Sequence, residues 1–204
     1  TEYHYYFAGI NPDNSEYYLN RGETFTTPRV AYTFSKEGLS GASRNFHRWA
    51  RRYQVRNADR ERMILLNSWE GVYFDINQKG MDQMMADIKS MGGELFVMDD
   101  GWFGDKYPRN NGTTSLGDWM IAPSKLPNGI RPLIDLAHSN GMKFGIWIEP
   151  EMVNNPSELY EKHPDWVLRH PDFEPTYGRG KTQLILDLTN PKVQDHVFKV
   201  VDDL

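Results

Sequence analysis

LFVMDDGWFG, residues 95–104, joins an apolar run to a turn that carries two adjacent aspartates. The run does not alternate between apolar and polar residues, which is typical of a strand buried on both faces of a parallel sheet. Three further runs share this pattern, over residues 63–66, 144–148 and 184–188. Short buried strands therefore form the frame of the predicted fold.

Helical patterns separate these runs. The expected helices are a stripe of apolar residues over 77–91 that stops at Gly92-Gly93, one marked by residues 133–137 and ended by Gly141, a short one over 157–163, and one opened by Asn190-Pro191. Glycine after the last turn and Asn-Pro before the first turn are usual helix boundaries. Strands that alternate with helices predict βαβ units, and hence an α/β fold with a parallel sheet.

The amino-terminal part has a different pattern. Residues 1–35 alternate in the manner of strands, with turn residues between them, which predicts the end of a β domain. Apolar residues then recur at helical spacing from Lys36 to Tyr53, so a linker helix is expected within residues 36–61. Residues 62–204 hold the strand and helix pattern of the α/β part.

The composition excludes several kinds of partner. The 204 residues carry a formal net charge of −5, whereas phosphate binding needs a concentrated basic surface, so no nucleic acid is expected. The longest apolar runs are far too short to cross a bilayer, so no membrane partner is expected. The chain has no cysteine, which removes disulfides and thiolate sites.

Acidic and aromatic residues come after the apolar runs. In a β/α barrel, the functional site is built from the loops at the carboxyl ends of the strands. Trp69, the pair Asp99 and Asp100, and Trp147 all lie at or near such ends. A flat indole packs on the C–H face of a sugar, and carboxylates accept the protons of its hydroxyls, so carbohydrate is the expected ligand class.

Each of these features also has a purely structural explanation. Asp99-Asp100-Gly101 can be a turn with a helix cap, and tryptophans near strand ends can belong to the core. Glu149 and Glu151 can pair with arginines. Taken from the residues alone, Asp99 and Asp100 are the candidates for an acid/base pair. About thirty residues without periodicity come after Asp100, and loops of that length are usually functional.

Four motifs carry a resemblance to a known family. They are Asn67-Ser68-Trp69-Glu70-Gly71, Met98-Asp99-Asp100-Gly101-Trp102-Phe103-Gly104, Gly117-Asp118-Trp119 and Gly145-Ile146-Trp147-Ile148-Glu149-Pro150-Glu151-Met152. In this order and at this spacing they resemble the motifs of glycoside hydrolase family 36 α-galactosidases, which belong to clan D. The resemblance covers essentially the whole chain, because the amino-terminal segment also resembles the end of that family's large β-sandwich domain.

The resemblance implies an architecture and a reaction. It implies a β-sandwich domain that ends at residue 35, and a (β/α)8 TIM barrel whose first four β/α units are residues 62–204. It implies retaining hydrolysis of terminal α-D-galactosyl residues from substrates such as melibiose and raffinose, without a metal or another cofactor. It also implies a protein of bacterial type that is located in the cytoplasm and forms a homo-oligomer in its full-length form.

The resemblance assigns binding roles to residues of this chain. By carry-over, Asp99 and Asp100 would hold the O4 and O6 hydroxyls of galactose. Trp69 and Trp147 would shape the sugar subsite, and Arg179 would reach it from a later loop. These assignments replace the acid/base roles that the residues alone indicate.

The catalytic carboxylates are expected outside this segment. In the resembled family, the nucleophile is an aspartate in a Lys-x-Asp type motif on the next strand, and the acid/base is an aspartate on a later one. No such motif occurs here, so both are expected beyond Leu204. The segment is therefore expected to supply sugar-binding loops but to be inactive when isolated.

Several alternatives remain open. Galactosyl transfer to a sucrose-type acceptor, or a preference for N-acetylgalactosamine, would use the same sugar subsite. A metal-dependent barrel hydrolase could use Asp99, Asp100, Glu149 and Glu151 as ligands of a divalent ion. A non-catalytic carbohydrate-binding or oligomerisation segment would differ only in the residues after Leu204.

Overall fold

The chain divides into two compact units, Thr1–Glu61 and Arg62–Leu204. The computed structural model describes residues 7–11, 16–170, 172, 177 and 182–204. Among these residues, no helix has both the length and the apolar character needed to cross a membrane.

The first unit contains one helix, α1 (Gly38–Tyr53), within its described residues. Asn45 holds this helix against the preceding segment, since its side chain donates to Thr33 Oγ1 at 3.0 Å and to the Phe34 carbonyl at 3.2 Å. The strands expected here are absent from residues 7–11 and 16–35. A strand exists only where a neighbouring strand pairs with its backbone, and no described neighbour does so. The assignment of this segment to a β-sandwich domain stays a prediction.

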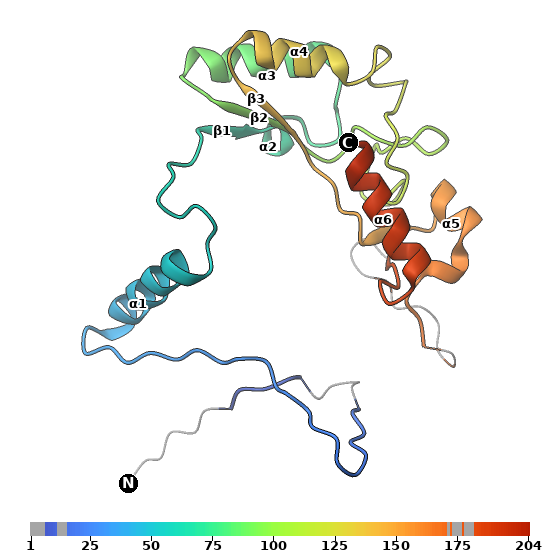
Figure 1. The fold of residues 1–204 in the computed structure, drawn as a ribbon. Helices are drawn as coiled ribbons and strands as arrows, with labels where there is room; N and C mark the ends of the chain where they lie inside the picture. The colour runs from blue at the N-terminus through green and yellow to red at the C-terminus, as the bar shows by residue number, and fades with distance from the viewer. Residues whose placement is uncertain (1–6, 12–15, 171, 173–176, 178–181) are drawn as a thin grey trace. The chain divides into compact units, whose positions relative to one another are not determined.

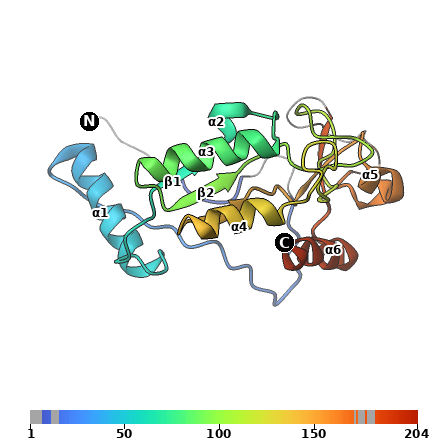
Figure 2. The ribbon, with the colours of Figure 1, turned by 90° about the horizontal axis from the view of Figure 1, so that it is seen from above.

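The second unit is built on a three-stranded parallel sheet in the order β1-β2-β3. Its strands are β1 (Leu65–Asn67), β2 (Leu95–Met98) and β3 (Lys143–Ile146). Two helices connect them, α3 (Gln78–Ser90) between β1 and β2, and α4 (Arg131–Ser139) between β2 and β3. Figure 1 shows both helices on one face of the sheet, and Figure 2 shows the same layer from above. This part agrees with the predicted βαβ pattern.

Local sequence signals explain where these helices begin and end. Asn77 caps α3, because its side-chain oxygen accepts the Gly80 N–H at 2.9 Å. Gly92 comes after α3 with φ +85° and Gly141 after α4 with φ +67°, a conformation that glycine adopts without strain. The apolar faces pack into one core, in which Met81, Met85, Phe96, Met98, Leu133 and Ala137 are fully buried. The methionines of α3 are therefore core residues.

The fourth apolar run does not join the parallel sheet. It forms β5 (Gln183–Ile185), which pairs antiparallel with β4 (Met152–Asn154) in a separate two-stranded sheet. Continuous apolar character shows that a strand is buried, but it carries no information about the direction of its partner. The expectation of four parallel strands was wrong on this point.

A second, smaller core includes residues of this antiparallel pair. Its elements are α5 (Glu158–Lys162), the 3-10 helix η1 (Pro164–Trp166) and α6 (Pro191–Asp203). Asn190 caps α6 through its side-chain oxygen, which accepts the Lys192 N–H at 3.0 Å, and proline occupies the first helical position as the sequence predicted. Val153, Leu184 and Val193 are buried at its centre.

The long segment between β2 and α4 is ordered by turns and long-range contacts. A short helix α2 (Trp69–Val72) lies directly after β1, and an isolated bridge joins Phe103 to Ile121 within the long segment. Asp118 is buried and accepts the N–H groups of Glu158 and Leu159, at 2.8 and 2.9 Å. Asp118 therefore caps the first turn of α5, about forty residues later in the chain.

Gly101 gives a test of the turn that comes after the two aspartates. Its φ is +119°, and a Cβ atom there would lie 2.9 Å from the Phe74 Cα, which is backbone that cannot move aside. We expect Gly101→Ala to destabilise the protein by about 1–3 kcal/mol, measured by denaturant unfolding. Gly112→Ala is the matched control in the same loop, because nothing lies within 4 Å of its added Cβ. Equal stability of the two variants would contradict this account.

Candidate functional site

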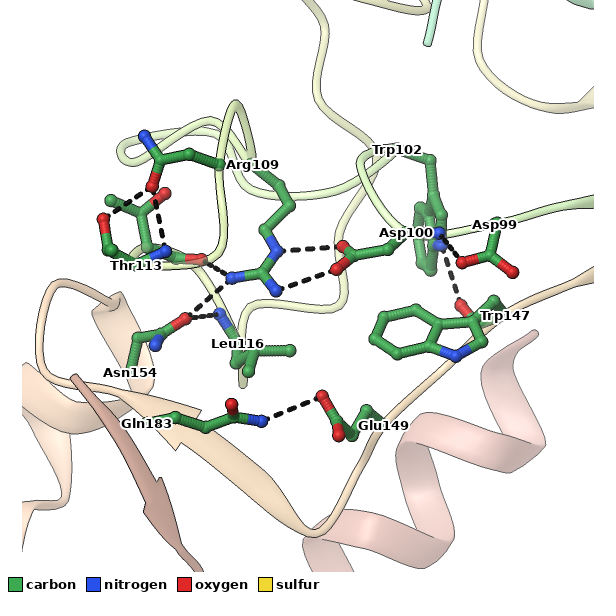
Figure 3. Close-up of polar contacts among 12 residues, drawn as sticks. Asp99, Asp100, Trp102, Arg109, Thr113, Leu116, Trp147, Glu149, Asn154 and Gln183 are labelled. Atoms are coloured by element: carbon green, nitrogen blue, oxygen red, sulfur yellow. Dashed lines mark hydrogen bonds and ion pairs between the residues drawn. The ribbon is translucent and has the colours of Figure 1, made fainter. Parts of the chain in front are cut away.

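A cavity of about 430 Å3 lies at the carboxyl ends of the parallel strands (Figure 3). It is lined by Trp69, Phe74, Asp99, Asp100, Arg109, Gly112, Thr113, Trp147, Glu149 and Gln183. Asp99 comes directly after β2, and Trp147 directly after β3. Parallel strands bring these ends to one edge of the sheet, as the sequence predicted.

A second cavity, of about 560 Å3, is larger but chemically simpler. Its walls are mostly apolar side chains of α4, β3 and the carboxyl end of α6, with His138 and Asp203 as its titratable groups. The smaller cavity brings together two aspartates, a glutamate and an arginine. We take the smaller one as the candidate site, because paired polar groups in a concave pocket determine specificity.

Asp99 is half-buried and is held by neutral donors. Asn67 Nδ2 donates to its Oδ2 at 2.5 Å, and the backbone N–H of Asp100 donates to its Oδ1 at 2.7 Å. The Asp99 N–H donates to Ser68 Oγ at 3.0 Å, which joins the end of β2 to the end of β1. Each carboxylate oxygen keeps a lone pair for a further donor.

Asp100 is held by a cation. Arg109 Nε donates to its Oδ1 and Nη2 to its Oδ2, both at 2.8 Å, in a two-pronged ion pair. The side chains are 4% exposed for Arg109 and 9% exposed for Asp100, so the pair is almost dry. Such charge-assisted contacts are stronger than neutral ones and fix the plane of the carboxylate.

Arg109 also ties the site to the rest of the unit. Its Nη1 donates to the Thr114 carbonyl at 2.6 Å and to Asn154 Oδ1 at 3.0 Å. The same Asn154 oxygen accepts the Leu116 N–H at 3.0 Å (Figure 3). The Arg109 carbonyl accepts from Lys125 Nζ at 2.7 Å, and burial lowers the pKa of Lys125 to about 8.

Glu149 lies on the opposite side of the cavity, where it accepts from Gln183 Nε2 at 3.0 Å. Burial, and then the neighbouring charge of Glu151, raises the pKa of Glu149. A carboxyl group with a raised pKa in a cleft is typical of functional sites. The arginine partner proposed for Glu149 from the sequence is replaced by the amide of Gln183.

The structure separates the four tryptophans of the strand-end motifs. Trp69 and Trp147 line the candidate site, whereas Trp102 and Trp119 line the other cavity. Trp102 is fully buried, and its Nε1 donates to the Trp147 carbonyl at 2.9 Å. Trp102 therefore supports the backbone that carries Trp147, and the core explanation holds for it.

Four of the five residues predicted to bind sugar meet in one cavity, namely Trp69, Asp99, Asp100 and Trp147. Arg179 lies outside the described residues. The roles of all five stay predictions.

Other lining residues were missed by sequence reasoning. The sequence offered a clue to Arg109 as a partner of the acidic turn. It is the one arginine between Arg62 and Arg131, and it comes shortly after that turn. The sequence offered no such clue to Phe74, Thr113 and Gln183.

The ligands of the metal-hydrolase alternative do not form a cluster. Within the described part of the chain, no three His, Cys, Asp or Glu side chains come together as a metal site. Both oxygens of Asp100 contact the cation Arg109 instead. The geometry gives the metal-hydrolase alternative no support.

A parallel sheet with helices on one face and an acidic, indole-walled cavity at its carboxyl edge is typical of the class of β/α-barrel proteins. The melibiase family model matches residues 24–204. The chain belongs to this family, in its glycoside hydrolase family 36 type, as the motifs predicted.

Relatives with known names agree. Alpha-galactosidase C of Emericella nidulans is 44% identical over 206 residues, which cover 96% of this chain and 27% of that protein. Alpha-galactosidase AgaA of Geobacillus stearothermophilus is 42% identical over 198 residues, which cover 96% of this chain and 26% of that protein. This chain therefore spans about a quarter of the length of these relatives.

Solved structures confirm the α/β fold class. The crystal structure of a GH36 α-galactosidase AgaA variant in complex with stachyose has a TM-score of 0.85 and 41% identity, and the match covers 96% of this chain and 27% of that one. The α-galactosidase from Lactobacillus brevis gives a TM-score of 0.67 and 44% identity over 72% of this chain and 19% of that one.

The raised pKa of Glu149 predicts a pH-dependent cost to stability. A carboxyl whose pKa is raised on folding destabilises the folded state above that raised value, and the cost vanishes below its usual value of 4.5. We expect Glu149→Gln to raise the melting temperature at pH 7 and to leave it unchanged at pH 4. Thermal unfolding at both pH values measures this.

Glu161 supplies a control of opposite sign. Its pKa is lowered by hydrogen bonds from Lys106 and Tyr107, so Glu161→Gln should not raise the melting temperature at pH 7. A gain for Glu149→Gln that persists at pH 4 would show that burial of charge is not its cause.

Proposed function

We propose that the protein containing this chain is an α-galactosidase that hydrolyses terminal α-D-galactosyl residues from galacto-oligosaccharides such as melibiose and raffinose. The observation that carries the proposal is the cavity in which Asp99 and Asp100 lie with the indoles of Trp69 and Trp147. Membership of the melibiase family, and the stachyose and raffinose named in the AgaA complexes, support the same substrate class.

In this proposal the two aspartates recognise the sugar through their remaining lone pairs. A carboxylate offers about four acceptor positions, and the contacts with Arg109 occupy two of those of Asp100. Asp99 likewise uses one position on each oxygen for Asn67 and for the Asp100 N–H. Hydroxyl protons of galactose, including that of the axial O4, fill the positions left on both residues.

The chain then contributes binding and orientation, while bond cleavage belongs to two further carboxyl groups. In a retaining hydrolysis, one carboxylate attacks the anomeric carbon and an acid protonates the leaving oxygen, after which water releases the sugar. We propose that both groups are aspartates outside this chain. Trp69 and Trp147 hold the ring and keep water from its apolar face.

Product analysis tests the proposal and its nearest alternatives. Release of galactose from melibiose and raffinose, first detected as the α-anomer by NMR, is expected for retaining hydrolysis. Formation of a longer oligosaccharide when sucrose is added would indicate galactosyl transfer. Preference for an N-acetylgalactosaminide would indicate an α-N-acetylgalactosaminidase.

Cytoplasmic location and a homo-oligomeric state of the full-length protein remain part of the proposal. Native mass measurement tests the oligomeric state.

Asp99→Ala tests whether this residue recognises the axial O4. A buried acceptor placed for that hydroxyl is left unpaired by the equatorial epimer, so it discriminates strongly between galactosides and glucosides. We expect Asp99→Ala to lower kcat/KM for an α-galactoside and to reduce the galactoside preference over the matched α-glucoside. The exposed Asp105 in the same loop is the control, and Asp105→Ala should change neither quantity.

The same position distinguishes a binding role from nucleophilic attack. If Asp99 were the nucleophile, Asp99→Gly would leave a space in which azide restores turnover and yields a glycosyl azide. No such product is expected from Asp99→Gly or Asp100→Gly. Its appearance would make these aspartates catalytic and refute the binding assignment.

Trp147→Ala tests the apolar wall of the sugar subsite. Its indole contacts the rings of Phe103 and Trp119, at centroid distances of 6.4 and 6.0 Å, so it is held from behind while its other face lines the cavity. We expect a loss of about 2–4 kcal/mol in transition-state binding, measured through kcat/KM. Trp147→Phe keeps an aromatic wall and should lose less. Equal, negligible losses would assign Trp147 to the scaffold.

A further inference from the structure

Arg109 is a buried arginine that connects several parts of the candidate site. Four hydrogen bonds join it to three separate segments, namely Asp100 after β2, the Thr114 carbonyl in the long loop, and Asn154 on β4. Its guanidinium carbon also lies 5.3 Å from the ring centre of Phe74 and 5.7 Å from that of Phe103. The guanidinium group is therefore fixed both in its plane and on its faces.

Asp100 depends on this arginine for its orientation. Arg109 donates one hydrogen bond to each oxygen of the Asp100 carboxylate, and these two bonds define the plane of that group. Asp99 is different, because Asn67 and a backbone N–H hold it. Loss of Arg109 would leave a buried carboxylate without its two N–H donors, and such a group turns toward other donors. Its oxygens then no longer point at the hydroxyl that they are proposed to bind.

We propose that Arg109 is a positioning residue for sugar recognition, which acts by holding the Asp100 carboxylate in one orientation. This inference rests on the proposed α-galactosidase function. Arg109 is 4% exposed and its fork faces Asp100, so its action on the sugar passes through that carboxylate. A lysine would keep the charge but lacks the fork that matches a carboxylate.

Asn154 connects Arg109 to the antiparallel strands β4 and β5. Its Oδ1 accepts from both Arg109 Nη1 and the Leu116 N–H, and its Nδ2 donates to Thr182 Oγ1 at 3.2 Å. Gln183, the next residue after Thr182, contacts Glu149 across the cavity. The arginine therefore sets the position of Asp100 relative to the opposite wall.

A double-mutant cycle tests the inference on the full-length protein. The variants are Arg109→Ala, Asp100→Asn and the double variant, and the quantities are kcat, KM and kcat/KM for an α-galactoside. If Arg109 acts through Asp100, each single variant should lose on the order of a hundredfold in kcat/KM. The kcat/KM of the double variant should then lie no more than about threefold below that of the less active single variant. Losses that multiply would overturn the proposal.

Two further variants separate positioning from loop stability. Asp118 holds the same loop to α5 by accepting the N–H groups of Glu158 and Leu159, so the loss in Asp118→Asn should multiply with that of Asp100→Asn. Arg109→Lys replaces Arg109→Ala in the cycle if the alanine variant fails to fold. Arg109→Lys should raise KM more than it lowers kcat, and should reduce the preference for galactosides over glucosides.

Failure of the proposed function and failure of the positioning role of Arg109 give different experimental results. A wild-type protein without activity on any α-galactoside would refute the proposed function before any variant is made. A wild-type protein that is active, with an Arg109 variant whose loss multiplies with that of Asp100→Asn, would refute the positioning role alone. Calorimetric titration with galactose provides a readout besides turnover, and the same non-additive pattern is expected there.

Discussion

The site depends on one buried ion pair, between Arg109 and Asp100. Removing two charges from water costs several kcal/mol per ion, and their attraction offsets this only when the geometry is good and the remaining donors are satisfied. The contacts are two-pronged at 2.8 Å and Nη1 has two further acceptors, so four of the five guanidinium N–H groups are used. Such a pair is weak evidence for stability, since an apolar pair would do as well. It is better explained by the need for a fixed carboxylate in the cavity.

The ion pair between Arg109 and Asp100 also explains why the long segment after β2 has a defined conformation. A loop of that length without regular structure loses much conformational entropy on folding, so it needs specific anchors. Arg109 is the central anchor, Lys125 binds the carbonyls of Phe74 and Arg109, and Asp118 caps α5 from within the segment. Each of these charged side chains makes at least one hydrogen bond to the backbone. The functional loop is therefore a folded part of the unit and not an appendage.

The sequence predicted the parallel part of the fold and four of the ten residues that line the candidate site. It succeeded where the signal is local, as with Asn77 and Gly92 at the ends of α3, or Asp99 directly after β2. It failed where the partner is distant in the sequence. The direction of β5 depends on β4, about thirty residues earlier, and the partner of Asp100 is a loop arginine whose pairing has no periodic pattern. The strands expected within residues 1–35 need neighbours that the described residues do not supply.

The different partners of Asp99 and Asp100 imply different tasks for two chemically identical side chains. A neutral donor such as Asn67 leaves the charge of Asp99 largely uncompensated, so in the proposed function Asp99 is the stronger acceptor for a sugar hydroxyl. The cation on Asp100 spreads that negative charge over the guanidinium, which weakens it as an acceptor but fixes its direction. Strong attraction at one position and fixed geometry at the next are what discrimination between epimers needs, because the axial hydroxyl must be bound and the equatorial one left without an acceptor. In the proposed function, Asp99 and Asp100 therefore both contribute to specificity, the first through the strength of its acceptor and the second through its direction.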